Sequence, residues 1–134
     1  MSFNLQRDEH SAPFFDATAR GQLLIRRCPR CDEFYPPHQR HCTDGTELEW
    51  AATSGQATLV TWVVDHGAVI DPALAGADGA TSVAGMVEFP EGPWMSVALV
   101  GVDLETLRVG DALEAHYLRL GDESVPVFGP LGRP

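Results

Sequence analysis

Three cysteines and their spacing constrain what this chain can fold into more than any other feature. Cys28 and Cys31 form a Cys-x2-Cys pair, and Cys42 begins a second turn further on. Gly45 stands where a fourth cysteine would complete the second pair, and the chain contains no other cysteine. Two such turns joined by short strands are the layout of a zinc ribbon, which holds one tetrahedral ion with four ligands. The spacing therefore predicts a zinc ribbon that lacks one thiolate.

Three side chains near the second turn are candidates for the missing ligand. Asp44 is one residue short of the expected position, His41 adjoins Cys42, and His38 lies in the loop between the two turns. Alternatively, the site is empty and hydrophobic packing holds the ribbon, through Leu23, Ile25, Phe34, Tyr35 and Trp50. Because the loss of a thiolate lowers metal affinity, the sequence favours weak or absent zinc binding.

The segments around the cysteines predict one short helix and a small sheet. Ser11 as a cap and Pro13 in the first turn favour a helix, which Gly21 would end in the left-handed conformation. Prolines restrict the middle ribbon strand to a sheet edge. The expected ribbon strands are residues 23–27, 34–37 and 47–50.

From Gly55 onward, short apolar runs alternate with turns that contain glycine, proline and aspartate. The expected strands are residues 57–64, 83–89, 94–100, 112–120 and 125–128, with a helical turn or loop at 103–107. Five strands with this spacing fit an oligomer-binding (OB) barrel, and a small β sandwich is the alternative.

The chain is therefore expected to be mainly β, with three successive parts. These are an N-terminal segment and helix (1–22), a zinc-ribbon-like domain (23–54) and an OB-fold domain (55–134). Residues 66–82 form one long connection between the first two barrel strands, of a length that is usually functional or mobile.

Acidic residues outnumber basic ones, and most of the excess lies in the predicted barrel. The formal net charge is −10, of which residues 51–134 carry −8, from three arginines against eleven acids. Nucleic-acid affinity comes largely from neutralising phosphates, so this charge argues against a nucleic-acid partner. A nucleic-acid-binding ribbon and barrel module is nevertheless the alternative function, since both folds serve that role.

The sign of the charge reverses between residues 20 and 42, where arginines form a candidate patch for phosphates or an acidic partner surface. Its members are Arg20, Arg26, Arg27, Arg30 and Arg40. A solvated ribbon surface is the alternative reading of this patch. The aromatic side chains of Phe14, Phe15 and Trp94 are candidate partner anchors, or they fill the seam between helix, ribbon and barrel.

No catalytic constellation is visible in the sequence, which contains no phosphate loop and no nucleophile elbow. We therefore expect no catalysis by this chain alone.

The N-terminal residues lack the pattern of a signal peptide, and no apolar run is long enough to span a membrane. These features predict a cytoplasmic protein without a membrane partner. Arginine without lysine is typical of a high-GC bacterial genome.

Taken in order, several short motifs resemble the family known as the domain of unknown function thirty-five. They are Pro13-Phe14-Phe15, the run from Gly21 to Cys31, Pro36-Pro37, Cys42, Gly55 with Thr58 and Val60, Val83 to Glu88, Glu91-Gly92-Pro93, Val109-Gly110-Asp111 and Pro126-Val127-Phe128. Family members carry an N-terminal helix, a rubredoxin-like zinc ribbon and a C-terminal OB fold. This chain departs from the family pattern at Asp32, His38 and Gly45.

The resemblance implies a non-catalytic companion of an acyl-CoA enzyme. The implied partner is a thiolase, a thiolase-like acyltransferase or aldolase, or a lipid-transfer-protein-like enzyme, in a hetero-oligomer. The implied ligand is an acyl-CoA, and some relatives are fused to hydratases that act on steroid side chains. The arginine patch and Phe14 and Phe15 are then the expected CoA or partner contacts.

Overall fold

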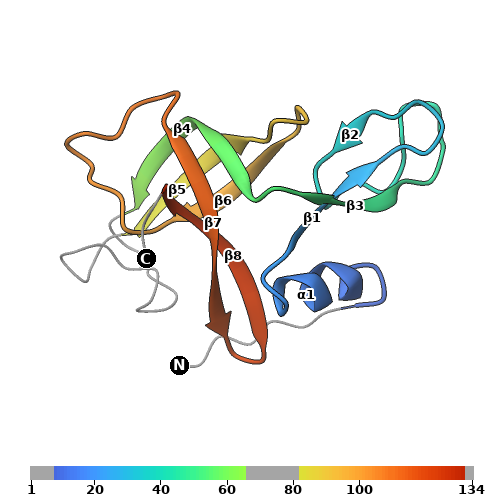
Figure 1. Cartoon of the computed structure of the whole chain (residues 1–134), viewed down its shortest axis with the longest axis horizontal. Coiled ribbons are helices and arrows are strands. Elements are labelled where there is room, and N and C mark those ends of the chain that lie inside the picture. The colour runs from blue at the N-terminus through green and yellow to red at the C-terminus, as the bar shows by residue number, and fades with distance from the viewer. Residues whose placement is uncertain (1–7, 66–81, 132–134) are drawn as a thin grey trace.

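The computed structural model describes residues 8–65 and 82–131. Figure 1 shows a small ribbon sheet on one side, a barrel on the other, and one helix where the two meet. The N-terminal elements are α1 (Ala12–Thr18), β1 (Leu23–Arg27), β2 (Phe34–Tyr35) and β3 (Glu49–Thr53). The barrel strands are β4 (Gln56–Asp65), β5 (Ser82–Glu88), β6 (Trp94–Leu99), β7 (Ala112–Leu120) and β8 (Glu123–Pro130). The predicted mainly β architecture with one short helix is confirmed.

The start of α1 differs from the prediction in its capping side chain. Ser11 occupies the N-cap position, but its side chain makes no capping hydrogen bond to the helix. Instead, the Asp8 carboxylate accepts hydrogen bonds from the backbone N–H groups of His10 (2.9 Å) and Ser11 (2.8 Å). Ser11 Oγ accepts one in return from the N–H of Asp8 (2.9 Å). This reciprocal pair resembles a capping box and begins the first turn at Asp8.

The end of α1 follows the prediction, because Gly21 has a φ of 73°. The N–H of Gln22 donates to the carbonyl of Ala17 (2.9 Å), and the N–H of Gly21 donates to that of Thr18 (3.0 Å). These two bonds form a Schellman motif, which satisfies carbonyls at the helix end. The tight turn sends the chain directly into β1.

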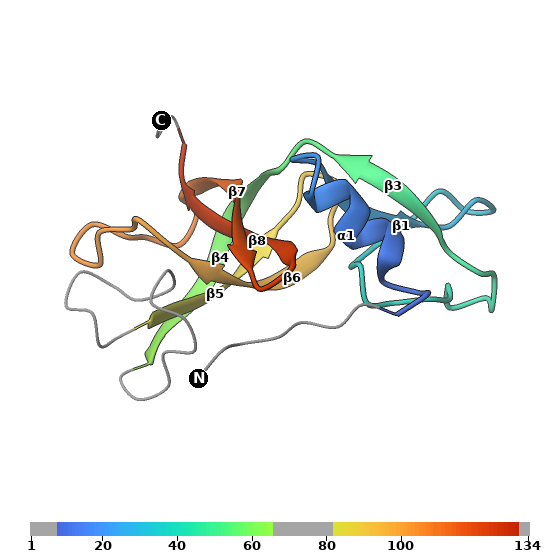
Figure 2. The ribbon, with the colours of Figure 1, turned by 90° about the horizontal axis from the view of Figure 1, so that it is seen from below.

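The ribbon sheet has the strand order β2-β1-β3, so β2 is an edge strand as its following prolines require. Leu23 and Ile25 of β1 are buried in the same hydrophobic cluster as barrel residues such as Leu59 and Phe128. Figure 2 shows α1 crossing the junction between ribbon and barrel. One hydrophobic core therefore continues from the barrel into the base of the ribbon.

The barrel is closed in the order β4-β5-β6-β8-β7, with β6 and β8 parallel and the other pairs antiparallel. This is the strand order of an OB fold, so the barrel prediction is confirmed and the sandwich alternative is wrong. Residues 103–107 form a turn, in which the N–H of Leu107 donates to the carbonyl of Asp103 (2.9 Å). The predicted long connection lies at 66–82, and all of it except Ser82 is outside the described residues. The three domain boundaries stay a prediction.

Candidate functional site

The three cysteines lie together at the tip of the ribbon. Their Sγ atoms are within 4.8 Å of one another, and those of Cys31 and Cys42 are 3.7 Å apart. Two ligands of a tetrahedral zinc ion with Zn–S bonds of about 2.3 Å would be about 3.8 Å apart. The separation of Cys31 and Cys42 therefore matches two corners of a zinc site, and the three clustered thiols can bind a metal ion.

The two turns share one hydrogen-bond pattern, but the second is one residue shorter. In the first turn, the N–H of Cys28 donates to the carbonyl of Glu33 and the N–H of Asp32 donates to that of Cys28. In the second, Cys42 bonds in the same way with Thr46 and Gly45. Asp32 (φ 64°) and Gly45 (φ 88°) are the left-handed residues of the two turns. Gly45 thus corresponds to Asp32.

The residue that corresponds to Cys31 is consequently Asp44, which precedes the left-handed residue of its turn. Its carboxylate accepts a hydrogen bond from the N–H of Thr46 (2.8 Å). The Thr46 side chain and this N–H lower the pKa of Asp44, and the nearby Cys42 thiol adds to the effect. Asp44 is not part of the three-thiol group. Its side chain interacts with the Cys42 thiol of that group.

The two histidines that the sequence offered as ligands lie elsewhere. His38 and His41 both line the groove described below and are not part of the three-thiol group. Of the three candidates for the fourth ligand, the fold thus places Asp44 in the position equivalent to a cysteine. Whether it binds metal stays a prediction.

The surroundings shift the pKa values of Cys31 and Cys42 in opposite directions. The pKa of Cys42 is lowered by the backbone N–H of Asp44 and by the Tyr35 hydroxyl, which lies 3.2 Å from its sulfur. The N–H of Glu33 lowers the pKa of Cys31, but desolvation and the neighbouring thiols outweigh it and raise that pKa to about 11. Close thiols titrate as a group. The pKa of Cys42 is therefore lowered and that of Cys31 raised within one group of interacting thiols.

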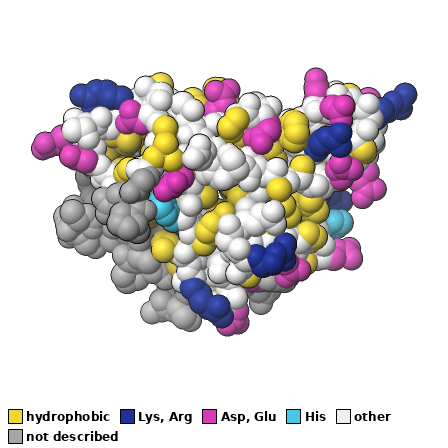
Figure 3. All heavy atoms as spheres, viewed as in Figure 1, with side chains coloured by type: hydrophobic (Ala, Val, Ile, Leu, Met, Phe, Trp, Pro, Cys, Tyr) yellow, Lys and Arg dark blue, Asp and Glu magenta, His cyan; other side chains and the backbone are white. Residues whose placement is uncertain are grey.

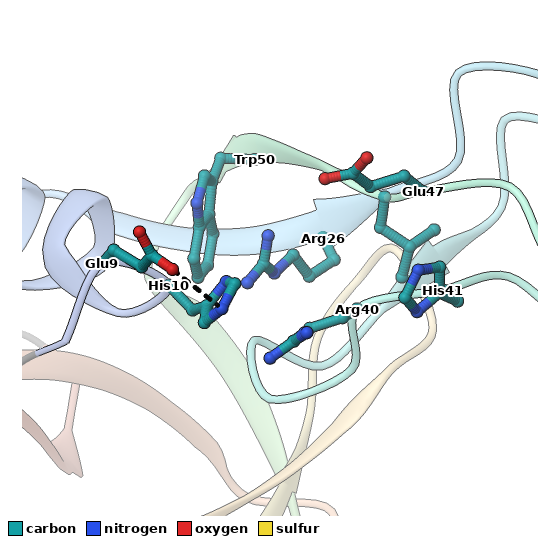
Figure 4. A pocket seen from close by; sticks show the side chains of 8 residues that line it. Glu9, His10, Arg26, Arg40, His41, Glu47 and Trp50 are labelled. Atoms are coloured by element: carbon teal, nitrogen blue, oxygen red, sulfur yellow. Dashed lines mark ion pairs between the residues drawn. The ribbon is translucent and has the colours of Figure 1, made fainter.

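A groove opens where the ribbon, the start of α1 and strand β6 of the barrel meet. It consists of two adjoining pockets that share His10, Arg26, Arg40 and Trp50. The polar pocket, of about 360 Å³, also contains Glu9, Glu47 and His41, and Figure 4 shows these side chains around it. The apolar pocket, of about 500 Å³, presents mainly apolar surface, to which Phe14, Phe15, Pro37, Trp50 and Met95 contribute. The groove thus presents cations beside an apolar surface.

Arg26 stands at the boundary of the two pockets and is only 8% exposed. Its Nε donates to the carbonyl of Pro37 (3.1 Å), and its guanidinium carbon lies 3.5 Å from the ring centroid of Trp50. Desolvation, and then the neighbouring Arg40, lower the pKa of Arg26. No carboxylate among the described residues lies within ion-pair distance of it.

The structure divides the predicted arginine patch. Arg26 and Arg40 meet in the groove, and both side chains point into it in Figure 4. Arg27 lies on the opposite face of β1, where its ion pairs with Glu49 and then Asp32 raise its pKa. Arg20 and Arg30 are exposed and line neither pocket, and Arg20 donates to the carbonyl of Asp16 (3.1 Å). Two of the five arginines are therefore brought together.

The predicted aromatic pair lines the apolar pocket. Phe14 contacts both Phe15 (5.5 Å between ring centroids) and Trp50 (6.1 Å). Phe14 also packs against the main hydrophobic cluster, so it contributes to the seam as well as to the pocket wall. Trp94, in contrast, is 51% exposed on β6 and donates to Glu88 (3.1 Å).

Sequence reasoning missed two contributors to the groove. His10 was not assigned a role, and Trp50 was assigned only to ribbon packing. The signal for Trp50 is its register, because it lies directly opposite Arg26 in the antiparallel β1–β3 pair. Such opposed side chains share one face of a sheet.

Acidic side chains lie on the surface of both the barrel and the ribbon. Figure 3 shows them at both ends of one face, over the barrel and over the ribbon. Within the described residues, no helix is long and apolar enough to cross a membrane.

Comparison with known proteins supports this architecture. A family model described as "ChsH2, C-terminal OB-fold domain" matches residues 50–118. A solved structure described as "Ltp2-ChsH2(DUF35) aldolase" contains a similar chain, with 23% identity, a TM-score of 0.78, and coverage of 95% of this chain and 98% of that chain. A crystal structure of a DUF35-family protein of unknown function from Sulfolobus solfataricus matches with 13% identity and a TM-score of 0.60, covering 92% and 84% of the two chains. None of the curated proteins matches.

Proposed function

Because the chain belongs to the family of ChsH2 C-terminal OB-fold domains, we propose that it is a non-catalytic accessory subunit of a thiolase-like acyltransferase or aldolase. The observation that carries the proposal is the likeness to a chain of the "Ltp2-ChsH2(DUF35) aldolase" structure, which extends over 95% of this chain. That likeness includes helix, ribbon and barrel together. The proposed assembly is a hetero-oligomer of this chain with such an enzyme.

The proposed ligand of the assembly is an acyl-CoA, held in part by the groove of this chain. The cationic and apolar surfaces of the groove are suited to a molecule that combines phosphate groups with an uncharged arm. Lipid or steroid side-chain metabolism is the setting that the family resemblance suggests. In this arrangement the partner enzyme supplies the reacting groups, and this chain supplies binding surface.

Co-expression with a thiolase-like enzyme from the same genome tests the docking proposal. The tagged chain should retain the untagged enzyme through affinity and size-exclusion chromatography, at a fixed stoichiometry. The activity of the enzyme towards its CoA thioester should fall when the chain is omitted. If the enzyme elutes separately and has equal activity with and without the chain, the proposal is wrong.

A further inference from the structure

We propose that Arg26 and Arg40 form a phosphate-binding site inside the groove, for the phosphate group of an organic ligand. The inference deepens the proposed function and rests on it only for the identity of the ligand. The site itself follows from the burial and the unsatisfied charge of Arg26.

Arg26 is a nearly buried cation without a counter-ion among the described residues. Its Nε bonds to the Pro37 carbonyl and its face stacks on Trp50. The terminal nitrogens make no further hydrogen bond or ion pair within the described part of the chain, and they face the groove (Figure 4). Buried charges in proteins are normally paired, since desolvation is costly. A ligand anion would supply the missing pair.

Arg40 adds a second positive charge beside Arg26. Arg40 also lines both pockets, and its side chain makes no hydrogen bond or ion pair with described residues. Its proximity disfavours the charged form of Arg26. Two adjacent cations that repel each other lower stability unless an anion lies between them. Arginine forks suit bidentate contact with phosphate oxygens.

The charge of the site favours a phosphate over a carboxylate. A phosphate monoester carries nearly two negative charges at neutral pH, which matches two guanidinium groups. A carboxylate carries one and would leave half of the cationic charge unpaired. The carboxylates of Glu9 and Glu47 in the polar pocket form no ion pair with the two arginines: Glu9 is 87% exposed beside His10, and Glu47 is also exposed. Glu47 partly offsets the lowering of the Arg26 pKa, but the effects of desolvation and of Arg40 are larger.

The apolar pocket indicates that the phosphate belongs to a larger molecule. Phe14, Phe15 and Met95 continue the groove directly from Arg26. An inorganic ion would leave this surface in water, whereas a phosphate ester can place its uncharged arm there. A ligand with a phosphate at one point and an apolar or amide-containing arm beside it fits both pockets.

Calorimetric titration of the isolated chain with coenzyme A tests the site at low ionic strength. The parent protein should bind, inorganic pyrophosphate should compete, and added salt should weaken binding. Arg26→Gln should weaken binding about tenfold or more, since the removed contacts are charge-assisted hydrogen bonds. Arg27→Gln is the matched control, because it makes the same charge change on the same strand outside the groove. Its affinity should equal that of the parent.

Arg40→Gln provides a second variant in case Arg26→Gln fails to fold, because the Arg40 side chain is exposed and makes no hydrogen bond or ion pair with the described residues. It should weaken binding several-fold. The proposal is wrong if the parent does not bind, or if Arg27→Gln weakens binding as much as the groove variants. It is also wrong if the groove variants bind like the parent. Capture of the partner enzyme is scored separately. A parent chain that captures the enzyme but does not bind coenzyme A or pyrophosphate would therefore reject this site and leave the docking proposal standing.

Discussion

The guanidinium of Arg26 lies 3.5 Å above the ring of Trp50, directly across the β1–β3 pair. Phe14 of α1 contacts the same indole, so Trp50 joins the ribbon to the helix. Since a cation is attracted to the negative face of an aromatic ring, this stacking compensates part of the cost of burying Arg26. It also fixes the direction in which the terminal nitrogens point. Trp50 is therefore a positioning residue for the groove.

Replacing Trp50 with leucine should destabilise the ribbon–helix junction. The change removes the cation–π contact and the contact with Phe14, and it leaves Arg26 less well compensated. We expect a loss of about 2 kcal/mol in the free energy of unfolding, because the side chain is half-buried. Urea denaturation followed by circular dichroism measures this. Trp50→Phe keeps a ring face and should lose less than half as much. If both variants lost the same free energy of unfolding, the aromatic face of Trp50 would add nothing to stability beyond the volume of the side chain.

Thr18 should anchor α1 to the barrel through its hydroxyl group. The side chain is 1% exposed, and Oγ1 lies 2.6 Å from the carbonyl of Ser124 in β8 and 3.0 Å from that of Phe15. Thr18→Val keeps the shape but leaves the half-buried Ser124 carbonyl without this donor, which should cost about 1 kcal/mol. Thr18→Ser, which retains the donor, serves as the control. Hydrogen exchange of the α1 amides should accelerate in the valine variant only, and unchanged exchange there would contradict the anchoring role.

The Asp8 cap should make the stability of α1 depend on pH at the acidic end. The N–H and hydroxyl of Ser11, and then the N–H of His10, lower the pKa of Asp8 in the folded chain. A carboxyl with a lowered folded pKa stabilises the fold above its unfolded pKa of about 3.9, and this contribution is lost as the pH falls through the folded value. Thermal unfolding measured from neutral pH down to about pH 2 should show the loss.

Asp8→Asn separates this charge effect from the cap itself. Asparagine retains an acceptor for the same N–H groups, but it does not titrate. The parent should be more stable than this variant at neutral pH, and the difference should shrink as the pH falls below about 4. Asp8→Ala should be less stable than Asp8→Asn at every pH. A constant difference between the parent and Asp8→Asn across this range would rule out the titration of Asp8.

The sequence was sufficient where a local signal determines the structure. Gly21 ends the helix because only a residue that tolerates positive φ fits there, and the turn residues between apolar runs placed all five barrel strands within a few positions. The capping side chain was harder to predict, because Ser11 and Asp8 are both good caps and the hydrogen-bond partner decides between them. The family resemblance and the strand count together led to the OB fold.

The residues of the groove were harder to predict, because they are brought together by the pairing of strands that are distant in sequence. Arg26 and Arg27 are neighbours in sequence, but neighbouring strand residues face opposite sides. Arg26 therefore contacts Trp50 and lines the groove, whereas Arg27 forms an ion pair with Glu49 on the opposite face. The alternation was readable from the sequence, whereas the cross-strand partners depend on the β1–β3 register. The groove also includes β6 of the barrel, which no local pattern links to the ribbon.

The shortened second turn leads to a prediction about metal affinity. Because Asp44 corresponds to Cys31, Asp44→Cys should place a fourth thiolate beside the other three. A four-ligand structural zinc site is worth about 10–16 kcal/mol, or roughly 3 kcal/mol for each ligand. The variant should therefore bind zinc roughly a hundredfold more tightly than the parent. Competition with a chromophoric chelator measures the affinity, and cobalt substitution reports the number of thiolates through its charge-transfer bands.

Gly45→Cys is the matched control, because it restores the Cys-x2-Cys spacing of the sequence at the wrong place in the fold. Gly45 has a φ of 88°, where a side chain is strained, and a Cβ there would meet nothing within 4 Å. A thiol at this position would therefore point into open space, so its zinc affinity should stay near that of the parent. The opposite order, with Gly45→Cys tighter than Asp44→Cys, would show that the second turn rearranges around metal and that sequence spacing, not the hydrogen-bond pattern, identifies the fourth ligand.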